Sequence, residues 1–186
     1  MSTIPERNRR MRGKGSIQVL VALVVVAAVA YWAGRRSAPQ LPPEAESAAR
    51  GAQLVEVGGC DDCHTPKMPD HSLDLSVRFS GYHADTPLPP TNEPGTMTAN
   101  AQVTAFRGDW GVSKARNITS DPTTGIGNWT LDQFIQTMRS GVDPAGMKIM
   151  PPMPVEALSH ASTADLTAIY NYLRTVKPVV NQVTGE

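Results

Sequence analysis

The sequence predicts an all-α domain with a long irregular loop, preceded by an N-terminal transmembrane helix. Three segments have helical apolar spacing, near residues 47–57, 131–140 and 163–175, and the last two begin with capping patterns. Between the first two, residues 66–127 show little periodicity and are rich in Pro, Gly, Thr, Asn and Asp. An uncharged apolar run near the N-terminus supplies the membrane helix.

The run Cys60-Asp61-Asp62-Cys63-His64 follows the first predicted helix. A Cys-x-x-Cys-His run is the attachment signature of a c-type haem. Its two thiols can each form a thioether with a haem vinyl group, and the imidazole can ligate iron on the proximal side. We therefore expect one covalently bound haem c, anchored by Cys60 and Cys63, with His64 as the proximal iron ligand.

Three other kinds of site use closely spaced cysteines. A structural zinc site normally needs four ligands, often from two pairs, and this chain has two cysteines in all. A thioredoxin-like pair requires a βαβ context, which the flanking Gly58-Gly59 and Thr65-Pro66 do not indicate. A disulfide across so short a loop would remove little entropy from the unfolded chain. Haem attachment is the favoured interpretation.

The N-terminal region has the pattern of a membrane anchor. Residues 1–16 form a basic segment, and the apolar run 17–34 would span about 27 Å as a helix, close to the thickness of a bilayer core. The basic segment is expected to stay in the cytoplasm, which places the following domain in the periplasm. A cleavable signal peptide is the alternative, because Ala28-Val29-Ala30 offers a cleavage site. Residues 35–46 are rich in proline and predict a linker to a domain over residues 47–180.

Formal neutrality hides an uneven distribution of charge. Residues 1–36 contain seven Lys or Arg and one Glu, whereas residues 37–186 contain ten Lys or Arg and sixteen Asp or Glu. The net charges of the two parts are +6 and −6. An acidic exported domain argues against nucleic acid as a partner and is compatible with steering toward a basic protein surface.

Local signals define the three helices of the domain. The first is expected from Ser47 to Val57 and ends at Gly58-Gly59. The second opens at the capping box of Thr130 and Gln133 and stops at Gly141. The third follows the capping residue Ser162 and runs to about Thr175, with one apolar stripe formed by Leu166, Ile169, Tyr170 and Leu173.

The irregular segment 66–127 is unusually long for a compact domain. It becomes reasonable if it wraps a large apolar cofactor, and the ten aromatic residues of the chain are few enough to fit a porphyrin as the main aromatic body. Short β or 3₁₀ pieces are expected near residues 102–110, where Val103, Phe106 and Trp110 would pack on the haem edge.

The order of these motifs resembles a class I (mono-haem) cytochrome c over roughly residues 47–176. Segments 115–122 (Ala-Arg-Asn-Ile-Thr-Ser-Asp-Pro), 124–130 (Thr-Gly-Ile-Gly-Asn-Trp-Thr) and 151–154 (Pro-Pro-Met-Pro) are similar to the cytochrome subunits of membrane-bound bacterial alcohol and sugar dehydrogenases. Those relatives often carry three haem modules, whereas this chain has one haem motif. The resemblance implies a cytochrome c fold in which the first and last helices cross near Gly51 and Tyr170.

The resemblance also implies a methionine ligand ahead of the last helix. Met147, Met150 and Met153 lie there, and the latter two are followed by proline, which holds the backbone extended. Nine residues separate Met153 from Ser162, near the spacing in the resembled family. Met153 is therefore the expected distal ligand and Met150 the second choice, while Met97 in the polar loop is a weaker candidate.

Other side chains have weaker claims to a role. His71, His83 and His160 are alternative distal ligands, although each is more readily explained as a loop or surface residue. Asp61 and Asp62 are expected to be solvated. Lys148 and Arg116 are candidates to bind the haem propionates.

These features favour an electron carrier over an enzyme. Iron held by a histidine and a methionine would exchange single electrons between the redox partners of a respiratory or dehydrogenase chain, such as a dehydrogenase, a quinol-oxidising complex or a terminal oxidase. The alternative is a haem enzyme or a gas-binding or gas-sensing haem protein with an open or labile sixth coordination site. A third possibility is a cytochrome that serves chiefly as a structural subunit of such a complex.

Overall fold

The computed structural model describes residues 22, 24–29, 31 and 43–184. The chain divides into two compact units, Met1–Leu41 and Pro42–Glu186, and the second unit contains the predicted cytochrome domain. The predicted basic segment 1–16 and most of the predicted anchor 17–34 and linker 35–46 lie outside the described residues. Within the described part of the chain, no helix is long and apolar enough to cross a membrane.

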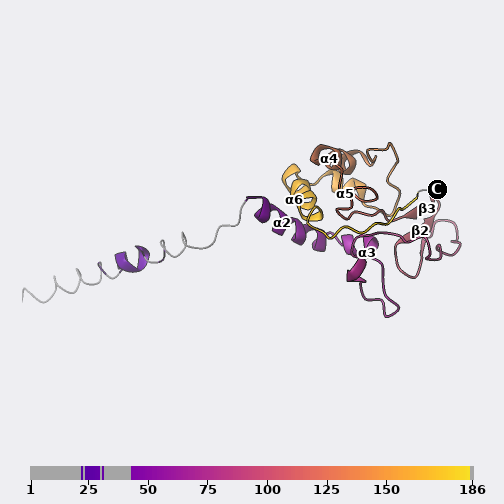
Figure 1. Ribbon diagram of the computed structural model, residues 1–186, viewed down its shortest axis with the longest axis horizontal. Coiled ribbons are helices and arrows are strands. Elements are labelled where there is room, and N and C mark those ends of the chain that lie inside the picture. Colours follow the sequence, from indigo (N-terminus) through magenta and orange to yellow (C-terminus); the bar gives the residue numbers. More distant parts are fainter. Residues whose placement is uncertain (1–21, 23, 30, 32–42, 185–186) are drawn as a thin grey trace, which may run out of the picture. The chain divides into compact units, whose positions relative to one another are not determined.

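The first helix of the domain, α2 (Pro43–Val57), begins four residues before the expected start at Ser47 (Figure 1). Glu44 and Glu46 lie in its first turn, where their negative charges favour the exposed N–H groups of the helix end. The helix ends at Gly58-Gly59 as predicted, and Gly59 adopts a positive φ of 64°. The short helix α3 (Cys60–His64) follows at once and contains the whole Cys-x-x-Cys-His run.

Helix α4 (Leu131–Ser140) confirms its sequence signals in detail. The Thr130 hydroxyl accepts a hydrogen bond from the Gln133 backbone N–H, and the Gln133 side chain accepts one from the Thr130 N–H. At the other end Gly141 takes the left-handed conformation and donates to the Thr137 carbonyl. Every group in these two caps lies within four residues of its partner, so the sequence alone suffices to predict them.

The last helix, α6 (Thr163–Leu173), begins after the capping residue Ser162, as predicted. Leu166 and Leu173 of its predicted stripe are buried, and Ile169 and Tyr170 are half-buried. A short helix that was not predicted, α5 (Val155–Ser159), lies between the methionine-rich loop and Ser162. Its five residues are too few to show a helical period.

Helices α2 and α6 cross at Gly51 and near Tyr170, as predicted, and the residues that contact the glycine are the two on either side of that tyrosine, Ala168 and Tyr172. A Cβ atom at Gly51 would lie 1.9 Å from the Ala168 carbonyl oxygen and 2.8 Å from the Tyr172 Cβ, so the two backbones touch here. Tyr170 faces another direction, since its hydroxyl donates to the Trp129 carbonyl and its ring packs on Phe134. Ala168 and Tyr172 are four residues apart and share a helix face, which Tyr170 does not.

The all-α prediction is incomplete, because the long segment contains a small antiparallel sheet. Strands β1 (Thr98–Ala99), β2 (Ala105–Gly108) and β3 (Gly111–Lys114) pair in that order, and the 3₁₀ helix η1 (Leu75–Val77) precedes them. Strand β2 falls within the region where short pieces were expected. The strands have two to four residues each, which is too short for a clear alternation of apolar and polar positions.

Polar side chains shape much of the remaining irregular backbone. The Asn100 amide oxygen accepts from the backbone N–H groups of Thr104 and Ala105, and the Asp121 carboxylate accepts from those of Thr123 and Thr124. Two apolar clusters accompany this network. The buried members of the larger cluster are Val55, Phe79, Ile126, Phe134 and Leu173, and those of the smaller are Tyr82, Ala105 and Val183.

Candidate functional site

Helix α3 presents two free thiols on one helical turn. Cys60 and Cys63 are three positions apart, both half-buried, and neither forms a disulfide. Burial, followed by the charge of Asp61, raises the pKa of the Cys60 thiol to about 11, and burial also raises the pKa of Cys63. Both groups are therefore neutral thiols at pH 7, in an arrangement that suits two thioether bonds to one flat group.

The His64 ring is held in a defined orientation. Its side chain is buried, with 8% of the residue exposed, and its Nδ1 lies 2.7 Å from the Arg116 carbonyl oxygen. A carbonyl oxygen accepts only, so Nδ1 carries the proton and donates it. Burial lowers the pKa of His64, which keeps the ring neutral. The lone pair of Nε2 is consequently available to a metal.

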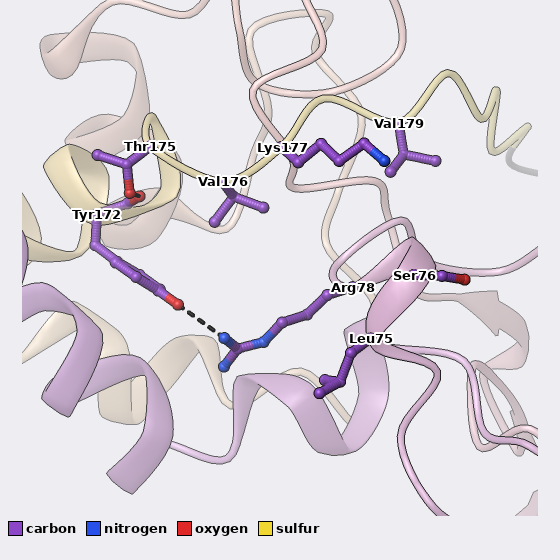
Figure 2. Close-up of a pocket in the computed structure, with 8 residues that line it drawn as sticks. All are labelled: Leu75, Ser76, Arg78, Tyr172, Thr175, Val176, Lys177 and Val179. Carbon is purple, nitrogen blue, oxygen red and sulfur yellow. Dashed lines mark hydrogen bonds between the residues drawn. The ribbon is translucent and has the colours of Figure 1, made fainter.

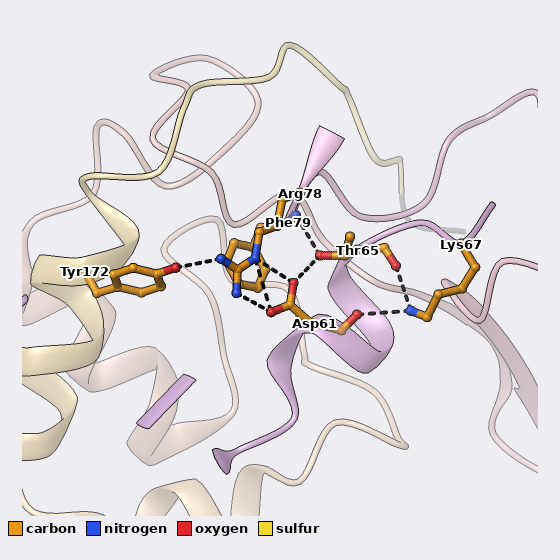
Figure 3. Close-up of polar contacts among 6 residues, drawn as sticks. All are labelled: Asp61, Thr65, Lys67, Arg78, Phe79 and Tyr172. Carbon is orange, nitrogen blue, oxygen red and sulfur yellow. Dashed lines mark hydrogen bonds and ion pairs between the residues drawn. The ribbon is translucent and has the colours of Figure 1, made fainter. Parts of the chain in front are cut away.

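Asp61 is not solvated, contrary to the prediction from sequence. Its carboxylate accepts from Arg78 Nε at 2.9 Å, from Arg78 Nη2 at 2.5 Å and from the Thr65 hydroxyl at 2.6 Å (Figure 3). These partners hold the pKa of Asp61 below its usual value although burial opposes them. Asp62, by contrast, is exposed, as predicted. The Asp61–Arg78 pair is 17 residues apart, so no local pattern indicated it.

The same arginine connects α3 to the last helix. Arg78 Nη1 donates to the Tyr172 hydroxyl at 2.9 Å, and its guanidinium carbon lies 4.5 Å from the centre of the Phe79 ring (Figure 3). One side of Arg78 borders a pocket of about 220 Å³ (Figure 2). The Arg78 side chain is 35% exposed and borders this pocket, although each of its three guanidinium nitrogens donates a hydrogen bond. The pocket is lined by Leu75, Ser76, Arg78, Tyr172, Thr175, Val176, Lys177 and Val179.

The three candidate methionines lie on one loop between α4 and α5. Met153 is half-buried, whereas Met147 and Met150 are each 38% exposed. The loop is fixed at its start by a bond from the Ile149 N–H to the Gly141 carbonyl, and at its middle by a bond from the Ser113 hydroxyl of β3 to the Pro151 carbonyl. The Met147 sulfur accepts from Arg116 Nη2 at 3.3 Å. Met153 is thus the least exposed of the three.

The remaining candidates are dispersed. His71 and His160 are exposed, and the His83 ring pairs with the Ser80 hydroxyl at 2.8 Å. Met97 is 49% exposed in the loop before β1. Lys148 is exposed, and the Arg116 guanidinium is directed to Met147, to the Val183 carbonyl and, at 4.0 Å, to Asp143.

Sequence reasoning missed two groups that hold the histidine. One is the Arg116 carbonyl, which is 52 residues from His64. It is a backbone group, so a residue of any type at this position would supply it. The other is Gly81, whose N–H donates to the His64 carbonyl at 2.8 Å. A glycine in a segment rich in turn residues carries no special signal, so neither group was predictable from a motif.

The donor set fits a covalently attached haem. Two neutral thiols and one imidazole with a free Nε2 stand on five consecutive residues, and the ring is already oriented by the bond to Arg116. The Trp110 Nε1 is buried and has no hydrogen-bond partner among the described residues. A buried donor of this kind indicates a polar acceptor that the described residues do not supply.

The sequence of this chain is similar to those of several known cytochromes. No protein-family model matches the sequence. The chain is 30% identical over 134 residues to the fructose dehydrogenase cytochrome subunit of Gluconobacter japonicus and 28% identical over 167 residues to a diheme cytochrome c-type protein of Cereibacter sphaeroides. It is also 30% identical over 147 residues to one of the subunits of nicotinate dehydrogenase from Pseudomonas putida.

These matches cover 72%, 88% and 76% of this chain but 22%, 49% and 10% of the three relatives, in the same order. The chain therefore spans between a tenth and a half of the length of the relatives it matches. Cytochrome c subunits of quinone-dependent alcohol dehydrogenases and of a gluconate 2-dehydrogenase match at similar identity. The similarity supports a cytochrome c module in this chain, and haem c is the cofactor that such a module implies.

Proposed function

We propose that this protein is a membrane-anchored, periplasmic c-type cytochrome with one haem, which carries single electrons and is not itself an enzyme. The observation that carries the proposal is the geometry of α3, where Cys60 and Cys63 flank one turn that ends in His64. The His64 Nδ1 proton is engaged by the Arg116 carbonyl, so its Nε2 is the proximal iron ligand. Haem, when bound, supplies an iron that alternates between ferric and ferrous states.

Met153 is the proposed distal ligand, with Met150 as the second choice. Met153 is half-buried on a loop that the Ser113–Pro151 bond ties to β3, so its sulfur is held with less loss of freedom than that of an exposed side chain. A thioether ligand favours the ferrous state and raises the reduction potential. A filled sixth position leaves no site for substrate, which is the reason for proposing a carrier.

The donor or acceptor is proposed to be a dehydrogenase in the same membrane system. The named relatives include cytochrome subunits of fructose, alcohol and gluconate dehydrogenases. The net charge of −6 over residues 37–186 suits steering toward a basic partner surface. The predicted anchor at residues 17–34 would keep the domain at the periplasmic face of the membrane. Extraction with mild detergent followed by affinity purification should recover a dehydrogenase together with this chain.

The distal ligand can be tested by substitution of each methionine. Met153→Ala should abolish the iron–thioether charge-transfer band of the oxidised protein and lower its reduction potential, while Met150→Ala should retain both. Exogenous carbon monoxide should bind the reduced Met153→Ala protein and bind the wild type poorly at neutral pH. Ready binding to the wild type would instead indicate a haem protein with an open sixth position. Loss of the band in Met150→Ala alone would reassign the ligand.

A further inference from the structure

His64 is supported from two directions by one small part of the fold. Its ring donates to the Arg116 carbonyl, and its own carbonyl accepts from the Gly81 N–H at 2.8 Å. The neighbours of these two groups also bond to each other, since the Tyr82 N–H donates to the Ala115 carbonyl at 2.9 Å. The segments 80–82 and 115–117 therefore bond both to His64 and to each other, and they are treated below as one unit that supports the histidine.

Gly81 makes this close approach possible. It has a φ of 78°, and a Cβ at this position would lie 2.3 Å from the Ala115 carbonyl oxygen and 2.7 Å from the Arg116 carbonyl oxygen. The second of these atoms is the acceptor for His64 Nδ1. Any side chain at position 81 would have to displace that carbonyl, because the obstructing atoms are backbone and cannot rotate away.

The segment after α6, residues 176–184, fastens this unit from the other side and is called the C-terminal strap. The Asn181 side-chain amide donates to the Ser80 carbonyl at 2.8 Å and to the Tyr82 carbonyl at 2.9 Å, which are the residues on either side of Gly81. Both protons of one NH₂ group are thereby used. In Figure 1 the strap passes from the end of α6 to the C-terminus beside β2 and β3.

Two further contacts hold the strap in place. The Asn117 side chain donates to the Val179 carbonyl at 2.7 Å, which fixes the residue that follows Arg116. Val183 is 4% exposed and packs with Tyr82 and Ala105. The strap thus bonds to both segments that contact His64, although it does not contact the histidine itself in any described interaction.

A hydrogen bond from Nδ1 to a carbonyl raises the basicity of the imidazole, and a more basic ligand stabilises ferric over ferrous iron. The strength of this bond depends on where the Arg116 carbonyl lies. A displacement of a few tenths of an ångström weakens it, because the hydrogen-bond energy falls steeply with distance and angle.

We propose that Gly81 and Asn181 are positioning residues for the proximal haem ligand, and that through the Arg116 carbonyl they set the electron-donating strength of His64. Gly81 provides the space for the carbonyl, and Asn181 holds the surrounding backbone in register. This inference rests on the proposed function, because it requires His64 to ligate the haem iron.

The test uses four variants of the full-length protein. Gly81→Ala fills the space beside the Arg116 carbonyl, and Asn181→Ala removes both amide donors without touching the backbone. Gly95→Ala is the matched control for the first, because Gly95 has a φ of 75° and donates its N–H to Asp109, yet nothing lies within 4 Å of an added Cβ. Gln182→Ala, at an exposed strap position next to Asn181, is the control for the second.

Two readouts separate positioning from general stability. One is the reduction potential, and the other is the exchange rate of the His64 Nδ1 proton, followed by NMR in the ferrous form. Gly81→Ala and Asn181→Ala should raise the potential and speed the exchange by roughly fivefold to tenfold, the factor that corresponds to one lost hydrogen bond. Both controls should match the wild type in potential and exchange.

Unchanged potential and exchange in Asn181→Ala with full haem content would overturn the inference while leaving the proposed function intact. The same holds if the controls shift as far as the test variants. If Gly81→Ala fails to fold, the comparison of Asn181→Ala with Gln182→Ala still decides the matter. A wild-type protein without covalent haem would overturn the proposed function and this inference together.

Discussion

Arg78 joins helix α3, which contains the Cys-x-x-Cys-His run, to the C-terminal helix α6 with a single side chain. It forms a two-pronged ion pair with Asp61 of α3 and donates to the Tyr172 hydroxyl of α6. Asp61 is 13% exposed in this pair, so its charge depends on the arginine and on Thr65 for compensation. The arrangement contrasts with the Arg50–Asp165 pair, whose side chains are 60% and 27% exposed.

We expect Arg78→Met to destabilise the domain by about 2 kcal/mol, since Asp61 would keep a poorly solvated charge, although the partial exposure of the arginine limits the cost. Asp61→Asn combined with Arg78→Met should recover part of that loss. A double-mutant cycle from denaturant unfolding measures the coupling. The same cycle on Arg50 and Asp165 should give less than about 1 kcal/mol. Equal coupling in the two pairs would contradict this view of Asp61.

Asp121 gives the domain a dependence on acid pH. Backbone and hydroxyl donors of Thr124, followed by the Thr123 N–H, hold the pKa of Asp121 below its usual value. The stabilisation is therefore complete above the unfolded pKa of about 4 and is lost as the pH falls through the lower folded value. Asp121→Asn should make the free energy of unfolding less steep with pH below about 4. Unfolding curves at a series of pH values would show this, and an unchanged slope would refute it.

Among the elements, the α2–α6 crossing is the most constrained contact. Gly51 allows the backbones to touch at Ala168, so even one methyl group must push the helices apart. Gly51→Ala should cost roughly 1–3 kcal/mol in spite of the better helix propensity of alanine. Thermal or denaturant unfolding measures the loss, and Gln53→Ala at an exposed position of the same helix should be nearly neutral. A Gly51→Ala protein more stable than the wild type would show that a methyl group fits between the two helices without moving them apart.

The elements also show what a sequence can reveal. The caps of α4, the stop of α2 at Gly59 and the start of α6 at Ser162 were predicted because all their partners lie within a few residues. Strands β1 and β3, helix α5 and the early start of α2 were missed because short or polar elements leave no periodic signal. The solvation of Asp61 was misjudged for another reason, since its burial depends on Arg78, which lies 17 residues along the chain.

For the whole domain, we expect stable folding to require haem. The described apolar clusters are small, and much of segment 66–127 is ordered by polar contacts whose net stabilisation is modest. Replacement of Cys60 and Cys63 by alanine should give a domain that is readily cleaved by protease and lacks a cooperative unfolding transition. Limited proteolysis and near-ultraviolet circular dichroism measure these properties. A compact haem-free domain with a sharp transition would contradict the expectation.

The site as a whole was predictable only in part. The thiols, the histidine and the methionine loop stand in recognisable order along the chain. Their supporting groups, the Arg116 carbonyl, Gly81 and Asn181, are specified by how distant segments pack, and the relevant partners are 17 to 101 residues apart. A motif identifies the atoms that carry out the chemistry, whereas the fold decides how firmly they are held.

The C-terminal strap has a consequence for the timing of assembly. Its bonds from Asn181 close loops of 99 and 101 residues, and contacts at such separations form late because their closure entropy is large. A chain synthesised as far as residue 175 already contains Cys60, Cys63 and His64, but it lacks the Asn181 amide that bonds to the backbone near the histidine. The hydrogen bonds from the Asn181 amide to the Ser80 and Tyr82 carbonyls are therefore expected among the last to form, so the backbone around His64 reaches its final position late in folding.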